Sequence, residues 1–199
     1  MSPDVRAAYE EMLAAQVMPR LRDLGFGADL RRDTPGEGTV AIGFAGERAT
    51  FPGQVAFAIE VRAATGRWVS YARETGADEP AQIWGRVAPP AGFGFHLGSD
   101  DWNLRTAADA PGYGAQIARL LGDVVVPGIE RHLELNAALE RAFADGEAVA
   151  AFGPPPALPG IINRMSYAEP DDPYVAWLRA GAVHTGPPSG VTPSRRRSG

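Results

Sequence analysis

The spacing of apolar residues changes twice along the chain, and this change constrains the fold more than any other feature. Apolar residues recur at helical spacing from Val5 to Leu24, alternate with small or polar residues between 39 and 62, and return to helical spacing over 117–143. Further short strand candidates lie at 82–87, 92–97 and 101–105, and a short helix or an irregular excursion is expected over 65–74.

The connections between the strand candidates decide how they pair. Short turns can join antiparallel strands, whereas a parallel crossover takes about a dozen residues or more. The sequence therefore predicts an α+β domain with an N-terminal helix and a four- to five-stranded, mainly antiparallel sheet. A C-terminal helical region is expected to pack on one face of that sheet.

The first helix carries its own start and stop signals. Ser2 can cap it, Pro3 suits the first helical position, and Gly25 can adopt the left-handed conformation that ends a helix. Pro19 lies inside the apolar pattern, where it removes a backbone donor and clashes with the preceding turn. We therefore expect a kink or a break near Val17.

Proline usage marks the domain boundary, because nine of the 18 prolines fall in the last 47 residues. We predict a single α+β domain over 1–150 and a Pro-rich extension over 151–190 with one short helix near 173–180. A disordered basic tail is expected over 191–199, where three consecutive arginines precede the end of the sequence.

Composition excludes several classes of protein. The sequence has no cysteine, which excludes disulfides, thiolate zinc sites and a cysteine nucleophile. No basic stretch followed by an apolar run opens the sequence, and no apolar stretch of 18 residues occurs. We therefore expect a cytoplasmic protein with no membrane partner. A net charge of -5 argues against nucleic acid as a partner, and the use of Arg without Lys is typical of a GC-rich bacterial genome.

Several short motifs resemble a bacterial family known as domain of unknown function 4304. In that family a helix with an internal proline ends in Leu-Gly-Phe before a strand pair, as the run Met18–Phe26 does here. The other similar segments are Val55–Val61, Asp101–Leu104 and Pro127–Glu130, so the resemblance covers roughly residues 5–140. Gly27-Ala28-Asp29 departs from it, because the family tends to place basic residues there. The resemblance implies an α+β domain and supplies no mechanism.

Two motifs that carry chemistry in other proteins are incomplete here. Gly112-x-Gly114 precedes a helix as a phosphate-binding turn does, but Ile117 stands where a third small residue belongs. We therefore interpret it as a helix start. His132 and Glu134 form a His-x-Glu motif as in zinc deaminases, but two residues apart on a helix they diverge. The sequence predicts no metal site and no cofactor.

Strand alternation gathers one set of polar residues on the sheet face that points away from the core. Its members are Glu60, Arg62, Trp84, Arg86, His96, Asn103 and Arg105. Small residues at 41, 43, 56 and 58 leave a shallow floor on the same side. Arginine suits bidentate recognition of carboxylate or phosphate, although an ordinary solvated face is the plain alternative. A register error of one residue would scatter the set.

Two functional classes follow. In the first, the chain is a binding or accessory module that recognises an acidic protein or a small anionic ligand through the Arg-rich face. In the alternative it is an enzyme or carrier for a small anionic or aromatic molecule, with His96 and Glu60 as candidate acid/base groups and Arg62, Arg86 and Arg105 as an anion clamp. We favour the first because no catalytic spacing is complete. A flat face would indicate binding, and an enclosed pocket around His96 and Glu60 would indicate catalysis.

Overall fold

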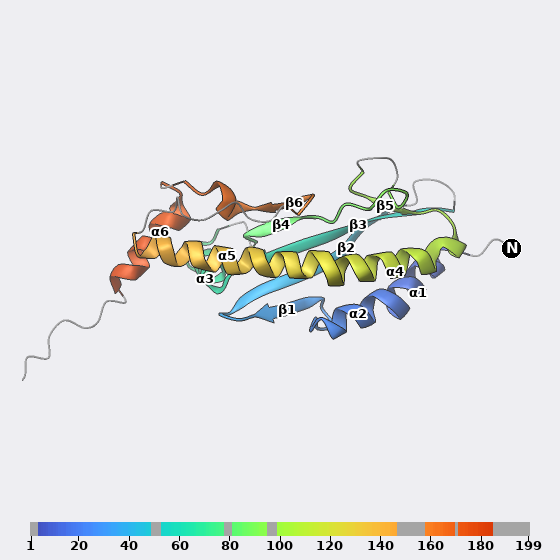
Figure 1. Cartoon of the computed structure of the whole chain (residues 1–199), viewed down its shortest axis with the longest axis horizontal. Coiled ribbons are helices and arrows are strands. Elements are labelled where there is room, and N and C mark those ends of the chain that lie inside the picture. The colour runs from blue at the N-terminus through green and yellow to red at the C-terminus, as the bar shows by residue number, and fades with distance from the viewer. Residues whose placement is uncertain are drawn as a thin grey trace, which may run out of the picture.

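The sheet is built around β3 (Val55–Ala64), which pairs antiparallel with β2 (Gly38–Arg48), β4 (Ile83–Arg86) and β5 (Trp102–Leu104). The computed structural model describes residues 4–48, 53–77, 81–94, 99–146, 158–169 and 171–184. In this part of the chain the sheet has six strands, because β1 (Arg31–Thr34) joins β2 and β6 (Ile161–Asn163) joins β4. The predicted α+β fold and its antiparallel pairing are confirmed (Figure 1).

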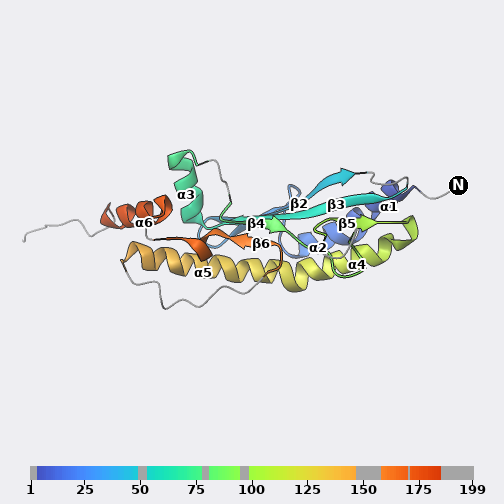
Figure 2. The same cartoon turned by 90° about the horizontal axis from the view of Figure 1, so that it is seen from above.

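Helices cover one face of the sheet, as Figure 2 shows. They are α1 (Val5–Met12), α2 (Met18–Asp23), α4 (Ala110–Leu120) and α5 (Val126–Ala144). β3 points Phe57, Ile59 and Val61 toward them, and all three side chains are almost completely buried. Tyr9 of α1 packs against Phe57 with 4.8 Å between ring centroids. We call the opposite side of the sheet, where Glu60 and Arg62 lie, the outer face.

Two π-helical turns carry the helical path past prolines. Leu13–Val17 joins α1 to α2, and Leu121–Val125 joins α4 to α5. Each is followed by a proline at the start of the next helix, Pro19 or Pro127. A wider turn suits a residue that has no backbone donor and whose ring crowds the preceding carbonyl. The irregularity predicted near Val17 is therefore a π-turn in a continuous helical path, not a break.

The first helical region ends at the predicted stop, but its cap is Asp4 and not the predicted Ser2. Asp4 caps α1 by accepting a hydrogen bond from the backbone of Arg6, while Ser2 and Pro3 lie outside the described residues. Gly25 follows α2 with a φ of 85°, which confirms the predicted stop. The short helix expected over 65–74 is α3 (Gly66–Thr75), capped by Thr65.

Several segments differ from the sequence expectation. β1 was not predicted, because its sequence Arg-Arg-Asp-Thr lacks the apolar alternation of a half-buried strand. The segment predicted as a strand over 92–97 contributes only a bridge between Gly94 and Trp102, and residues 95–98 lie outside the described part. Single-turn 3₁₀ helices lie at Ala107–Asp109 and Arg164–Tyr167.

The Pro-rich C-terminal segment adds to the sheet and to the core. It supplies β6 and then α6 (Pro173–His184), where the sequence predicts one helix near 173–180. Tyr174, Val175 and Leu178 of α6 join a second apolar cluster with Trp68 of α3 and Phe143 of α5. Residues 185–199, which include the predicted basic tail, lie outside the described part. Among the described helices, none combines the length and the apolar character needed to cross a bilayer.

We predict that Gly85→Ala releases β6 from β4. Gly85 has a φ of 155°, and a Cβ there would lie 2.0 Å from the backbone oxygen of Gly160. We expect the free energy of unfolding to fall by about 2–3 kcal/mol, measured by urea denaturation. The matched control is Gly43→Ala in β2, where a Cβ would meet nothing within 4 Å. The control is expected to change stability by less than about 0.5 kcal/mol. Equal effects of the two substitutions would contradict this account.

Candidate functional site

The register of the sheet places one row of side chains across five strands on the outer face. Directly opposed residues of antiparallel strands share a face. The successive partners in this row are Arg31, Ala41, Arg62, Trp84 and Ile162. The next row contains Gly43, Glu60 and Arg86. The structure therefore brings together Glu60, Arg62, Trp84 and Arg86 on one face, as the alternation pattern predicts.

Partly buried carboxylates hold two of these arginines. Glu60 lies 3.7 Å from Nη2 of Arg62 through Oε2 and 3.6 Å from Nη2 of Arg86 through Oε1. Asp101 Oδ1 lies 3.4 Å from Nη1 of Arg86. The alternation pattern predicts a single acid on this face, Glu60. Asp101 is a second one, because it comes just before β5 and reaches Arg86 only through tertiary packing.

The arginine side chains of this group are more exposed to solvent than its carboxylate side chains. The side chains of Arg62 and Arg86 are 62% and 47% exposed, whereas those of Glu60 and Asp101 are 30% and 26% exposed. The guanidinium groups are therefore the more accessible charges, and the carboxylates restrict how they orient. Beside them, Trp84 is half-buried and Ile162 is 47% exposed.

The remaining predicted site residues lie apart from this row. Asn103 is on the outer face opposite Ala56, but it is buried, and its Nδ2 donates to Oε1 of Gln54 over 3.1 Å. Arg105 follows the end of β5 and is exposed, with Nη2 donating to the backbone oxygen of Gly94 over 3.5 Å. His96 lies outside the described residues.

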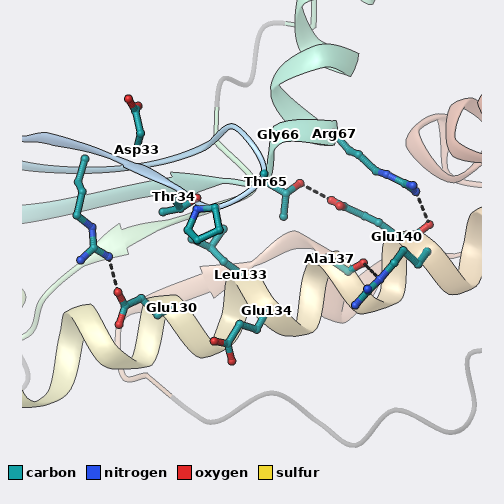
Figure 3. Close-up of a pocket in the computed structure, with 14 residues that line it drawn as sticks. Asp33, Thr34, Thr65, Gly66, Arg67, Glu130, Leu133, Glu134, Ala137 and Glu140 are labelled. Carbon is teal, nitrogen blue, oxygen red and sulfur yellow. Dashed lines mark hydrogen bonds and ion pairs between the residues drawn. The ribbon is translucent and has the colours of Figure 1, made fainter.

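A cavity of about 810 Å³ lies between α5, the turn joining β1 to β2, and the start of α3 (Figure 3). None of the site residues predicted from sequence lines it. Arg32 of β1 and Glu130 of α5 form an ion pair of 2.6 Å in its wall. Arg67 and Arg141 line it close to Glu140.

Glu140 is the most buried charged group of this cavity, with 1% of the residue exposed. Its Oε1 accepts three hydrogen bonds, from Thr65 Oγ1 at 2.5 Å, the Tyr174 hydroxyl at 2.6 Å and Gln82 Nε2 at 3.0 Å. Figure 3 shows the side chain of Thr65, at the start of α3, and that of Glu140, on α5, pointing toward one another. All three donors are neutral, so this carboxylate is held by hydrogen bonds without an ion pair in the described part of the chain.

The environment of Tyr174 favours the neutral phenol. Burial raises the pKa of its hydroxyl, and the Glu140 carboxylate that accepts its proton in a hydrogen bond raises this pKa further.

A second polar network lies one turn earlier on α5. The side-chain amides of Asn136 and Asn163 exchange hydrogen bonds of 3.1 and 2.8 Å. Asn163 Oδ1 also accepts from the backbone N–H of Met165, so its Nδ2 is the donor to Nδ1 of His132. This contact gives His132 the tautomer with its proton on Nε2. His132 is buried while Glu134 is exposed, so the predicted divergence of the His-x-Glu pair is confirmed.

These two networks were not predicted from the sequence, although α5 carries a signal for them. His132, Asn136 and Glu140 recur every four residues beside the apolar stripe, and all three are buried. Polar residues at that spacing within a buried stripe indicate internal hydrogen bonding. Among the described residues, no three His, Asp or Glu side chains gather in a way that could hold a metal ion.

We predict that the stabilising contribution of the neutral Tyr174 hydroxyl is lost in alkali, so that the free energy of unfolding falls. Because its pKa is raised above the ordinary value of 10.0, the folded state keeps a proton that the unfolded chain releases. Its contribution is complete below about pH 10 and decreases above it, by about 1.4 kcal/mol per pH unit. Urea unfolding of the wild type and of Tyr174→Phe at a series of pH values measures the difference. Parallel pH profiles for the two proteins would contradict the prediction.

Comparison of the whole chain with protein-family models, with curated proteins and with solved structures finds no match. The resemblance to domain of unknown function 4304 therefore stays a prediction.

Proposed function

We propose that this chain is a binding module whose outer sheet face docks on an acidic surface of a partner protein. The observation that carries the proposal is the cross-strand row in which exposed Arg62 lies beside Trp84 and Ile162. Arg31 and Arg86 extend the exposed basic groups on either side of this row.

The charge arrangement supports an acidic partner. A carboxylate from a partner meets the guanidinium groups first, because Glu60 and Asp101 lie deeper than Arg62 and Arg86. The internal ion pairs already restrict both arginine side chains, which lowers the entropy lost on binding. Arginine also binds carboxylates through two parallel hydrogen bonds.

The apolar neighbours support a protein rather than a small ion as the partner. Trp84 and Ile162 oppose one another on β4 and β6, so their side chains form a contiguous patch next to Arg62. Trp and Arg are enriched among the residues that dominate binding energy in protein interfaces. A patch of this kind offers both apolar contact area and a charge that orients the partner.

The alternative, an enzyme or carrier with His96 and Glu60 as acid and base, has less support. Glu60 is occupied by contacts with two guanidinium groups, and neither it nor Arg62, Arg86 or Arg105 lines the described cavity. His96 lies outside the described residues and so adds nothing to either proposal.

The test compares two double variants in affinity capture from lysate of the source cells, at low and at raised salt. Arg62→Gln with Arg86→Gln removes the outer-face charges, and Arg119→Gln with Arg131→Gln removes two exposed charges from α4 and α5. We expect an acidic protein that the wild type and the control retain and that the outer-face variant retains at least about tenfold less.

Raised salt should weaken the retention by the wild type, because exposed charge pairs are screened. Capture of the same proteins by the outer-face variant, or of none by the wild type, would overturn the proposal.

A further inference from the structure

We infer that the cavity beside α5 binds a small molecule that carries both an ammonium group and a carboxylate group. The inference is independent of the proposed function, because the cavity is lined by α5, the β1–β2 turn and the start of α3 and contains none of the residues of the cross-strand row. Its volume of about 810 Å³ falls within the range of small-molecule sites in proteins.

Glu140 supplies the group that meets the ammonium. All of its hydrogen bonds from described residues end on Oε1, so Oε2 receives none. Glu140 lines the cavity, so Oε2 is the carboxylate oxygen left for a ligand bound there. A carboxylate this deeply buried is costly when no cation compensates it. A ligand ammonium donating to Oε2 would provide that compensation.

Two arginines at the same end of the cavity supply the group that meets the carboxylate. Arg67 Nη1 donates to the backbone oxygen of Glu140 over 3.2 Å, and Arg141 Nε donates to that of Ala137 over 3.2 Å (Figure 3). These bonds orient both guanidinium groups along α5 and use one N–H each, so other N–H groups remain for an anion. Arg67 also lies in the first turn of α3, where the helix dipole favours negative charge.

The rest of the lining fits the carbon skeleton of such a ligand. Leu133, Ala137 and Pro35 provide apolar surface in the cavity wall. Arg32 and Glu130 neutralise one another further along α5, so they do not compete for either end of the ligand. A molecule with a single charge can interact either with Glu140 Oε2 or with the remaining N–H groups of the arginines, whereas a zwitterion can interact with both.

Calorimetric titration of the full chain with simple probes tests this inference. The zwitterions are β-alanine, γ-aminobutyrate and ε-aminocaproate, which differ in the separation of their charges, and the singly charged controls are hexylamine and caproate. We expect at least one zwitterion to bind about tenfold or more tightly than both controls. If no zwitterion binds, or if hexylamine or caproate binds as tightly as the best zwitterion, the inference is wrong.

Two variants test which side chain contacts the ammonium group of the ligand and which contacts its carboxylate group. Glu140→Gln keeps an oxygen for Thr65, Gln82 and Tyr174 but removes the charge, so we expect it to weaken zwitterion binding about tenfold and to leave caproate binding unchanged. Arg141→Gln is expected to weaken zwitterion binding and to leave hexylamine binding unchanged. If both variants lose affinity for all probes to the same extent, Glu140 and Arg141 do not contact the ammonium and carboxylate groups as assigned.

A further variant keeps the test decisive if Glu140→Gln unfolds. Ala137→Met fills the cavity wall without changing a charged group, and we expect it to abolish zwitterion binding. Its matched control is Ala115→Met on the exposed side of α4, which should bind as the wild type does. Undiminished binding by a folded Ala137→Met protein would place the ligand elsewhere and overturn the inference.

Discussion

β3 points Phe57, Ile59 and Val61 into the helices and points Glu60 and Arg62 to the opposite side, and most other features depend on this division. Successive side chains of a strand alternate between faces, so a shift of one residue would expose all three apolar side chains. Each would forfeit about 1.5–3 kcal/mol of burial free energy. Because β2, β4 and β5 all pair with β3, its register also sets theirs and hence the composition of the outer face.

Buried polar groups on α5 then determine where the C-terminal segments lie. His132 and Asn136 bond to Asn163 of β6, and Glu140 bonds to Tyr174 of α6. A buried polar group without a partner costs free energy, so each of these contacts favours one position of β6 or α6 over its neighbours. The Glu140 network also fixes one end of the cavity, because Thr65, at the start of α3, donates to the same oxygen.

The two candidate sites use charge in opposite ways. On the outer face, partly buried carboxylates hold exposed guanidinium groups, which suits contact with a large and wet partner surface. In the cavity a carboxylate is buried among neutral donors with one oxygen uncommitted, which suits a small ligand that can enter and desolvate. The sites involve different residues, so a single chain can carry both without competition between their ligands.

The sequence by itself determined the helical and strand segments with strong periodicity, the antiparallel pairing and the common face of Glu60, Arg62, Trp84 and Arg86. Each of these follows from spacings of two to four residues, which a local pattern records. Tertiary structure alone decided that Asp101 meets Arg86, that Asn103 is buried, and that β1 and β6 form the sheet edges. It also chose the hydrogen-bond partners of Glu140, which lie 34 to 75 positions away in the chain, because these contacts depend on how whole elements pack.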